Sequence, residues 1–217
     1  MRKRSSIALA CLALTTPRLA AADEPARPAD PSAHGKAART HDGFYLRLGA
    51  GPGFTSGSAS TSGVSATMKG MHVGTELAIG TTVAPGLVVG GGEFSMVVFG
   101  PKYEVSGQKS DAGTHHVGGV GPFVDYYLDP TKGLHFQGAL VLSGTRVDGK
   151  SGREGAFGVG FGALAGAGWE TWVGDQWSLG GLLRIGYYRV GVKGDDSDVK
   201  TTLSMLSPTV LITGTFH

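Results

Sequence analysis

The sequence contains a single cysteine, Cys11, and no apolar run long enough to cross a bilayer as a helix. A transmembrane helix needs roughly 20 consecutive apolar residues, whereas the apolar run over residues 7–14 is much shorter. Any membrane span must therefore be built from strands, and in lipid only a closed barrel satisfies every backbone group of a sheet. Because Cys11 lies in a segment predicted to be removed, the mature chain is expected to lack disulfides and thiol chemistry.

The first residues have the pattern of a cleaved signal peptide, which we predict over residues 1–22. Residues 2–4 are basic, residues 7–14 are apolar, and small residues precede the polar Asp23. This order is typical of a secretory signal, with cleavage after residue 20, 21 or 22. The run Ala8-Leu9-Ala10-Cys11 is an alternative, lipoprotein-like cleavage site, but an apolar stretch would then follow the lipidated cysteine.

The formal net charge of +2 does not describe the predicted mature chain. Removal of the four basic residues of the signal leaves a net charge of −2, so nothing here indicates binding to nucleic acid. Residues 23–42 are rich in Ala, Pro and charge without periodicity, which predicts a flexible periplasmic segment. The remainder, residues 43–217, has the length of one domain.

Alternating hydrophobicity divides this domain into eight predicted strands, separated by connections of two kinds. The strands are 43–54, 70–82, 87–99, 114–128, 134–145, 156–173, 177–190 and 201–216. Short turns at 83–86, 129–133 and 174–176 alternate with longer polar connections at 55–69, 100–113, 146–155 and 191–200. An even strand count with this asymmetry predicts an all-β, eight-stranded antiparallel up-and-down transmembrane barrel, with short turns in the periplasm and long loops outside.

Lone ionisable residues fall on the strand face opposite the bulky apolar side chains. A soluble sandwich would bury the apolar face, whereas a membrane barrel turns it to lipid and keeps charge inside, since a base facing mid-bilayer costs about 2–4 kcal/mol. The predicted lumenal charge set is Arg47, His72, Glu76, Glu93, Asp125, His135, Glu170 and Arg184, with Gln137 beside it. The third strand is accordingly predicted to turn Val88, Phe94, Met96 and Val98 to lipid.

The signal peptide, the eight strands, the lumenal Arg/Glu set and the ending Val210-x-Ile212-Thr213-Gly214-Thr215-Phe216 resemble small outer-membrane barrels of the OmpA, OmpX and OmpW type. The resemblance implies a location in the outer membrane of a Gram-negative cell, among outer-membrane lipid and lipopolysaccharide. It also implies that the barrel-assembly machinery recognises Phe216, although His217 follows it. The long loops would meet any extracellular partner.

The predicted function is that of a non-enzymatic outer-membrane protein with a structural or surface-interaction role and a salt-bridged lumen. Four predicted lumenal carboxylates face two arginines, which keeps open a narrow cation-selective pore or a small-ligand transport barrel. A lipid-modifying enzyme using His115 or His116 is a weaker alternative. These adjacent histidines face opposite sides of a strand and cannot chelate together, and the acidic run 195–198 is too short for a calcium loop. We therefore predict no catalytic residue, no cofactor and no metal site.

Overall fold

The computed structural model describes residues 39–61, 64–148, 156–193 and 200–217, which form antiparallel strands joined by turns. The strands are β1 (Phe44–Thr61), β2 (Val64–Ala84), β3 (Leu87–Val105), β4 (Gln108–Asp111), β5 (His115–Tyr127), β6 (His135–Val147), β7 (Ala156–Trp172), β8 (Trp177–Lys193) and β9 (Lys200–Phe216). Among these residues there is no helix long and apolar enough to cross a membrane.

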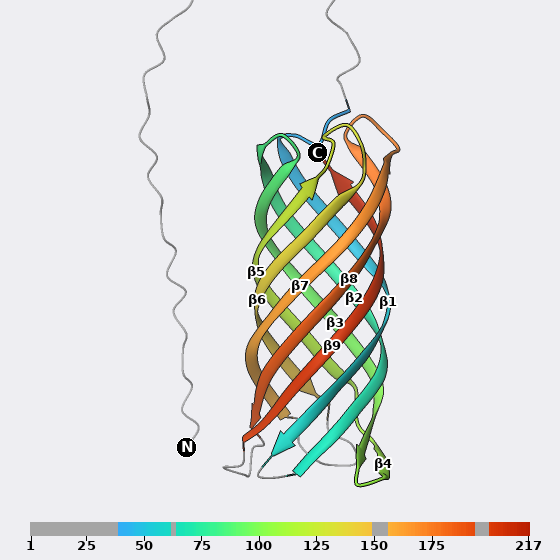
Figure 1. Cartoon of the computed structure of the whole chain (residues 1–217), viewed down its shortest axis with the longest axis vertical. Helices are drawn as coiled ribbons and strands as arrows, with labels where there is room; N and C mark the ends of the chain where they lie inside the picture. The colour runs from blue at the N-terminus through green and yellow to red at the C-terminus, as the bar shows by residue number, and fades with distance from the viewer. Residues whose placement is uncertain (1–38, 62–63, 149–155, 194–199) are drawn as a thin grey trace, which may run out of the picture. The chain divides into compact units, whose positions relative to one another are not determined.

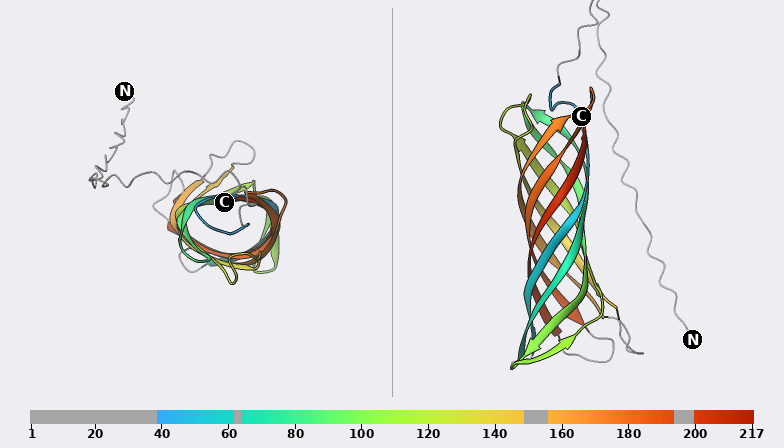
Figure 2. Two further views of the ribbon diagram at one scale, coloured as in Figure 1. Left: turned by 90° about the horizontal axis from the view of Figure 1, so that it is seen from above. Right: turned by 90° about the vertical axis from the view of Figure 1, so that its right-hand side faces the viewer.

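Eight of these strands close into a ring, as Figures 1 and 2 show. Each pairs antiparallel with its neighbour along the chain, and β1 also pairs with β9, with Leu46 opposite Phe216 and Ala50 opposite Ile212. The short β4 stands outside the ring and pairs only with the far end of β3. The fold is therefore an all-β, eight-stranded antiparallel up-and-down barrel, in which closure leaves the main ring without a free edge.

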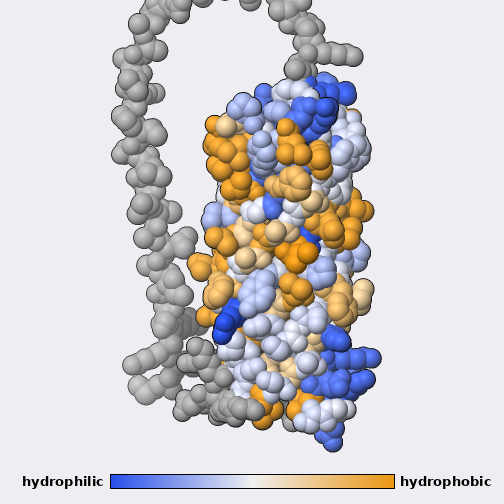
Figure 3. Space-filling view, viewed as in Figure 1, coloured by the Kyte–Doolittle hydropathy of each residue, from blue (hydrophilic) through white to orange (hydrophobic). Residues whose placement is uncertain are grey.

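The outer surface of the barrel is predominantly apolar. Leu140, Leu142 and Ile212 are 66%, 76% and 75% exposed, and the face seen in the space-filling view carries many apolar residues in its upper and middle parts (Figure 3). On β2, β6, β7 and β8, the apolar side chains on the strand face opposite the predicted lumenal charges point outward in the structure. They include Met71, Val73, Leu77, Ile79, Phe136, Phe157, Val159, Phe161, Trp169, Trp177, Leu179, Leu183, Ile185 and Tyr187.

The prediction for the third strand was wrong, because β3 has the opposite facing. Glu93 lies opposite Leu77 of β2 and Val120 of β5. Directly paired residues share a face of the sheet, and both partners point outward, so Glu93 is exposed on the outer wall. The bulky residues Val88, Phe94, Met96 and Val98 are instead buried inside.

Two connections predicted as polar loops are largely strand. β1 and β2 pair as far as Thr61 and Val64, so most of the segment 55–69 continues the barrel wall. The segment 100–113 forms the β3–β4 hairpin, which turns at Ser106 and Gly107, both with positive φ. Of the other two predicted loops, residues 149–155 and 194–199 lie outside the described residues.

The core of the protein is the barrel interior. Its buried apolar side chains are Tyr45, Met68, Ala78, Val88, Phe94, Met96, Val98, Val117, Phe123, Tyr127, Ala139, Val141, Leu164, Leu182, Tyr188, Val190, Leu203, Met205 and Leu211. Buried charged and polar side chains lie among them, which places the polar site within the core.

A strap of residues 39–43 lies across the barrel at its short-turn end, the end that carries turns 128–134 and 173–176. The view along the barrel in Figure 2 shows this blue segment inside the outline of the ring. The His41 backbone N–H donates to the Pro130 carbonyl at 2.8 Å, and the His217 N–H donates to the Gln176 carbonyl at 2.9 Å. The strap and the residue after β9 are thus held at the same opening.

Candidate functional site

An arginine and an aspartate form the centre of the buried polar site. Arg47 of β1 donates from Nη2 to Oδ2 of Asp125 on β5, and both side chains are completely buried. The Tyr45 hydroxyl donates to the same Asp125 oxygen at 2.8 Å. Glu76 and Glu170 flank the guanidinium, with carboxylate oxygens 3.8 and 3.9 Å from its nitrogens. One cation therefore faces three carboxylates.

A second arginine satisfies one of these carboxylates. Arg184 of β8 donates from Nη1 to Oε2 of Glu76 at 2.7 Å, and Gln137 of β6 donates to the other oxygen, Oε1, at 2.7 Å. The Arg184 guanidinium also lies over the Phe94 ring at 5.5 Å from its centroid, a contact that favours a cation. Strands from opposite sides of the ring thus meet through Glu76.

His72 forms a separate polar layer on the long-loop side of the charges. Its ring nitrogens lie 2.8 Å from the Thr55 hydroxyl and 2.9 Å from the Thr209 hydroxyl. The ring is 2% exposed and touches neither arginine by a hydrogen bond or ion pair in the described part of the chain. His72 therefore bridges β1, β2 and β9 instead of joining the ionic centre.

The structure places Arg47, His72, Glu76, Asp125, His135, Glu170 and Arg184 in the interior and brings all but His72 together. Glu93 is excluded, because β3 presents it on the outer wall. The buried side chains that the structure describes therefore contain three carboxylates and two guanidiniums. The interior retains an excess of one negative charge before any imidazole is counted.

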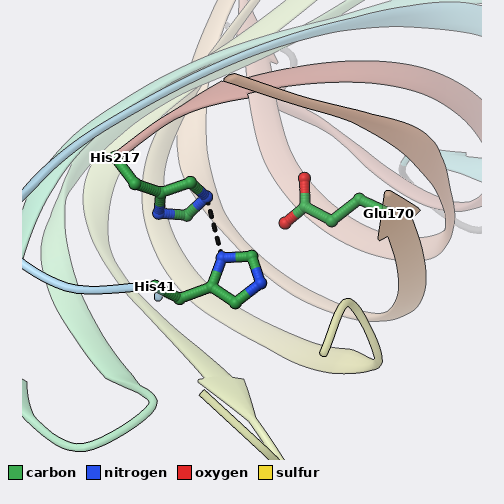
Figure 4. A group of neighbouring side chains, drawn as sticks. All are labelled: His41, Glu170 and His217. Carbon is green, nitrogen blue, oxygen red and sulfur yellow. Dashed lines mark hydrogen bonds between the residues drawn. The ribbon is translucent and has the colours of Figure 1, made fainter. Parts of the chain in front are cut away.

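Two histidines outside the predicted site, His41 and His217, close its short-turn end. With Glu170 they form a group, here called the histidine cap, in which one ligand-type atom from each residue lies within 4.8 Å of the other two (Figure 4). The Nδ1 atom of His41 and the Nε2 atom of His217 are 2.9 Å apart. Burial lowers the pKa of His41 to about 4 and that of His217 to about 3, so both rings are neutral near pH 7.

Aromatic rings surround the two imidazoles. The His41 ring stacks on Tyr127 at 3.7 Å between centroids and on Trp172 at 4.8 Å. His217 meets His41 edge-on at 4.3 Å and lies 5.2 Å from Trp172. The pair is thereby shielded from water and fixed in orientation.

The carboxylate of the histidine cap is held from its other side. The Tyr127 hydroxyl donates to Oε1 of Glu170, and the Ser178 hydroxyl donates to Oε2 at 2.7 Å. His135 is adjacent, with Nδ1 at 3.7 Å from Oε1 and at 3.0 Å from the Gly133 carbonyl oxygen. Glu170 therefore links the ionic centre to the histidine cap.

A cavity of about 440 Å³ lies at the opposite, long-loop end of the interior. Its lining is mostly apolar, including Ala59, Val192 and Leu203, and its polar members are Thr61, Tyr103, His115 and Thr201. The Tyr103 hydroxyl is 3.4 Å from Nε2 of His115. His116 lies on the outer face, 3.3 Å from Asp148, so the two neighbouring histidines face opposite sides.

Comparison with known proteins gives likeness in structure without likeness in sequence. No family model matches the chain, and no curated protein matches it. The outer membrane protein OprG from Pseudomonas aeruginosa superposes with a TM-score of 0.54 at 12% identity, over 83% of this chain and 100% of OprG. Weaker likenesses are the attachment invasion locus protein Ail of Yersinia pestis, with a TM-score of 0.42 at 14% identity over 78% and 99% of the two chains, and Neisserial surface protein A, with 0.39 at 19% over 78% and 96%. The chain therefore has the fold of the small eight-stranded outer-membrane β-barrel proteins.

Proposed function

We propose that this chain is a non-enzymatic, integral outer-membrane barrel whose interior is a salt-bridged plug and whose role is structural or in surface interaction. The observation that carries the proposal is the Arg47–Asp125 pair, which has no solvent exposure on either side chain. A water-filled channel at this level would expose the guanidinium, because removing a charged group from water is costly and the group stays hydrated where water can reach it.

Packing on both sides of the ionic centre supports a closed interior. Phe94 and Phe123 are 0% and 2% exposed at the level of the charges, and Met68 and Leu203 are 0% and 2% exposed towards the long-loop end. An eight-stranded barrel is about wide enough for side chains to fill. Ions would therefore meet a continuous packed core instead of a conduit.

The apolar outer wall supports insertion in lipid, and its aromatic positions at the short-turn end suit the interface. Phe216, the proposed signal for the barrel-assembly machinery, lies at the end of β9 with its ring 6.1 Å from Phe44 and 5.4 Å from Trp177. Such aromatic groups prefer the headgroup zone of a bilayer. Outer-membrane lipid and lipopolysaccharide are accordingly the proposed surroundings of the wall.

A surface role is supported by the β3–β4 hairpin, which extends beyond the ring at the long-loop end (Figure 1). All four residues of β4 are exposed, and Lys102 and Glu104 of β3 pair with Asp111 and Lys109. A charged hairpin of this kind is soluble outside the membrane and presents side chains to an extracellular partner.

The test is single-channel conductance of the refolded protein in a planar bilayer. The wild type should be silent, and Arg184→Ala should produce leak current, because it leaves Glu76 with one donor and removes the side chain that fills the lumen. Glu93→Ala is the matched control, since it removes a charge from the outer wall and should stay silent. Steady cation-selective current in the wild type would overturn the proposed plug and support a narrow pore instead.

The long-loop cavity favours a second candidate, a barrel that binds a small ligand for transport. Its volume and its mostly apolar lining with four polar side chains suit a small, mainly apolar molecule. Binding of a fluorescent apolar probe should be saturable and should be lost in Ala59→Trp, which fills the cavity. A probe signal unchanged by this substitution would report the lipid-facing wall instead.

A further inference from the structure

The histidine cap joins three parts of the chain that are distant in sequence. His41 comes from the strap before β1, Glu170 from β7, and His217 from the position after β9. We propose that His41, Glu170 and His217 form a binding site for a divalent transition-metal ion of the Zn²⁺ class. The ligand atoms would be Nδ1 of His41, Nε2 of His217 and a carboxylate oxygen of Glu170.

The spacing of these atoms fits one ion. Tetrahedral zinc with bonds of about 2.0–2.1 Å places its ligand atoms roughly 3.3 Å from one another. The Nδ1 atom of His41 and the Nε2 atom of His217 are 2.9 Å apart, and one ligand-type atom from each of the three residues lies within 4.8 Å of the other two. Figure 4 shows the Glu170 carboxylate directed towards the two rings. Small side-chain rotations, without movement of the strands, would complete the geometry.

The two histidines also supply suitable ligand atoms. Both rings are buried, and an imidazole nitrogen can offer its lone pair to a cation. One nitrogen of each ring, Nε2 of His41 and Nδ1 of His217, is buried with no hydrogen-bond partner among the described residues. When the two facing nitrogens share one proton, only one of their two lone pairs accepts a hydrogen bond. A cation bound between them would be coordinated by both lone pairs.

Charge provides an independent argument. Arg47 is paired directly with Asp125, and Arg184 with Glu76, which leaves Glu170 with its nearest guanidinium contact at 3.9 Å. The excess negative charge of the interior therefore lies at Glu170, beside the two histidines. A divalent cation at this position would offset it.

The contacts behind the ligands resemble those that orient metal ligands elsewhere. Tyr127 and Ser178 donate to the two Glu170 oxygens, and His135 approaches Oε1. Such outer contacts fix ligating carboxylates and strengthen metal binding. Two nitrogens and one oxygen favour Zn²⁺, Co²⁺ or Ni²⁺ over Ca²⁺ and Mg²⁺, which prefer oxygen ligands.

The consequence for the barrel is a clamp at the short-turn end. A bound ion would tie the strap before β1 to the end of β9 and to β7, next to the β1–β9 seam where the ring closes. Metal should therefore raise the temperature at which the barrel unfolds, since a ligand that binds the native state stabilises it.

The experiment is calorimetric titration of the untagged protein in detergent with Zn²⁺, together with the visible absorption spectrum of bound Co²⁺, which reports coordination geometry. We expect one ion per chain, a tetrahedral or five-coordinate Co²⁺ spectrum, no competition by Ca²⁺ or Mg²⁺, and a rise in melting temperature that EDTA reverses. His41→Ala and His217→Ala should each weaken binding at least about tenfold, because even outer contacts to metal ligands are worth that much.

His116→Ala is the matched control, since His116 is an exposed imidazole beside Asp148 and its loss should leave binding unchanged. His41 precedes β1, so its variant tests the site without altering a strand, and the heat-dependent gel shift of a folded barrel verifies its fold. The proposal is overturned by Zn²⁺ binding that survives both cap substitutions or is lost in His116→Ala. It is equally overturned if no saturable binding occurs up to about 1 mM Zn²⁺, since a Kd of that size corresponds to weak binding. Failure of the metal site by any of these results would leave the proposed plug standing, because the conductance test examines the plug separately.

Discussion

Arg47 and Asp125 face each other across the barrel interior from β1 and β5, which are not neighbours in the ring, and neither side chain is exposed. The pair therefore connects opposite walls through the core. The Tyr45 hydroxyl donates to Asp125, and Nε of Arg47 donates to the Thr215 hydroxyl, so each member of the pair has a further hydrogen bond. A buried pair with these added partners specifies one arrangement of the surrounding strands.

Arg47→Leu should destabilise the barrel by about 3–5 kcal/mol, because it leaves the Asp125 carboxylate buried without its cation. The measurement is reversible urea unfolding in lipid vesicles, followed by tryptophan fluorescence. Arg189→Leu is the control, since Arg189 is exposed on the outer face of β8 and the same substitution there should not destabilise the barrel. The double variant Arg47→Leu/Asp125→Leu should recover much of the loss, and failure to do so would show that the pair is not coupled.

Glu93→Leu should stabilise the barrel in a bilayer by about 1–2 kcal/mol, because an acid on the lipid face costs somewhat less than the 2–4 kcal/mol of a base. Glu76→Leu is the opposite case, since Glu76 accepts from Arg184 and Gln137 in the interior and its loss should destabilise. The same unfolding experiment compares the two variants. Destabilisation by Glu93→Leu would mean that this outward carboxylate has a partner, such as a second copy of the chain.

The facing of β3 shows where sequence reasoning failed. A lone charge was taken as the sign of the lumenal face, and the run 90–92 consists of three glycines that carry no facing signal. Inside the barrel, Phe94 lies opposite Gly119 of β5 and Met96 lies opposite Gly74 of β2, so apolar bulk and not charge decides the facing here. Pairing with Leu77, a clear outward residue, was needed to detect this.

The predicted ends of the first strands were wrong for a related reason. Residues 55–61 of β1 are mainly Ser, Gly, Ala and Thr, and hydrophobic alternation marks only the part of a strand that meets lipid. Backbone pairing continues past that boundary, as the Thr61–Val64 pair shows.

The charge set was largely predictable, whereas His41 and His217 lay outside every predicted strand. Their common position was nonetheless available, since the first and last strands of a barrel pair and bring the residues before and after them to one edge.

Gly53→Ala should destabilise the barrel by about 1–3 kcal/mol, the usual range for overpacking a core. A Cβ at Gly53 would lie 2.2 Å from Nε2 of His72 and 2.5 Å from the Pro208 carbonyl oxygen, so the His72–Thr209 hydrogen bond would have to break. Gly138→Ala in β6 is the control, because a Cβ there meets nothing within 4 Å. Equal melting temperatures for the two variants would contradict the close packing of His72.

Asp129 offers a test of pH dependence outside the barrel wall. Its Oδ1 accepts from the Thr131 amide at 3.0 Å, and its Oδ2 lies 2.9 Å from Lys132 Nζ. The Thr131 amide, followed by Lys132, lowers the pKa of Asp129 from 3.8 to about 2. Since the folded pKa is the lower one, the ionised carboxylate stabilises the 128–134 turn above pH 3.8, and this contribution is lost as the pH falls through about 2.

The measurement is an NMR titration of the Thr131 amide in detergent micelles. Its chemical shift should follow Asp129 with a midpoint near pH 2 and should lose this transition in Asp129→Asn. Lys132→Ala should raise the midpoint only in part, because the Thr131 amide is the larger cause and remains in place. A wild-type midpoint at the ordinary carboxylate value would mean that the amide does not hold the carboxylate, and that the turn is fixed by the Lys132 N–H bond to the Asp129 carbonyl oxygen instead.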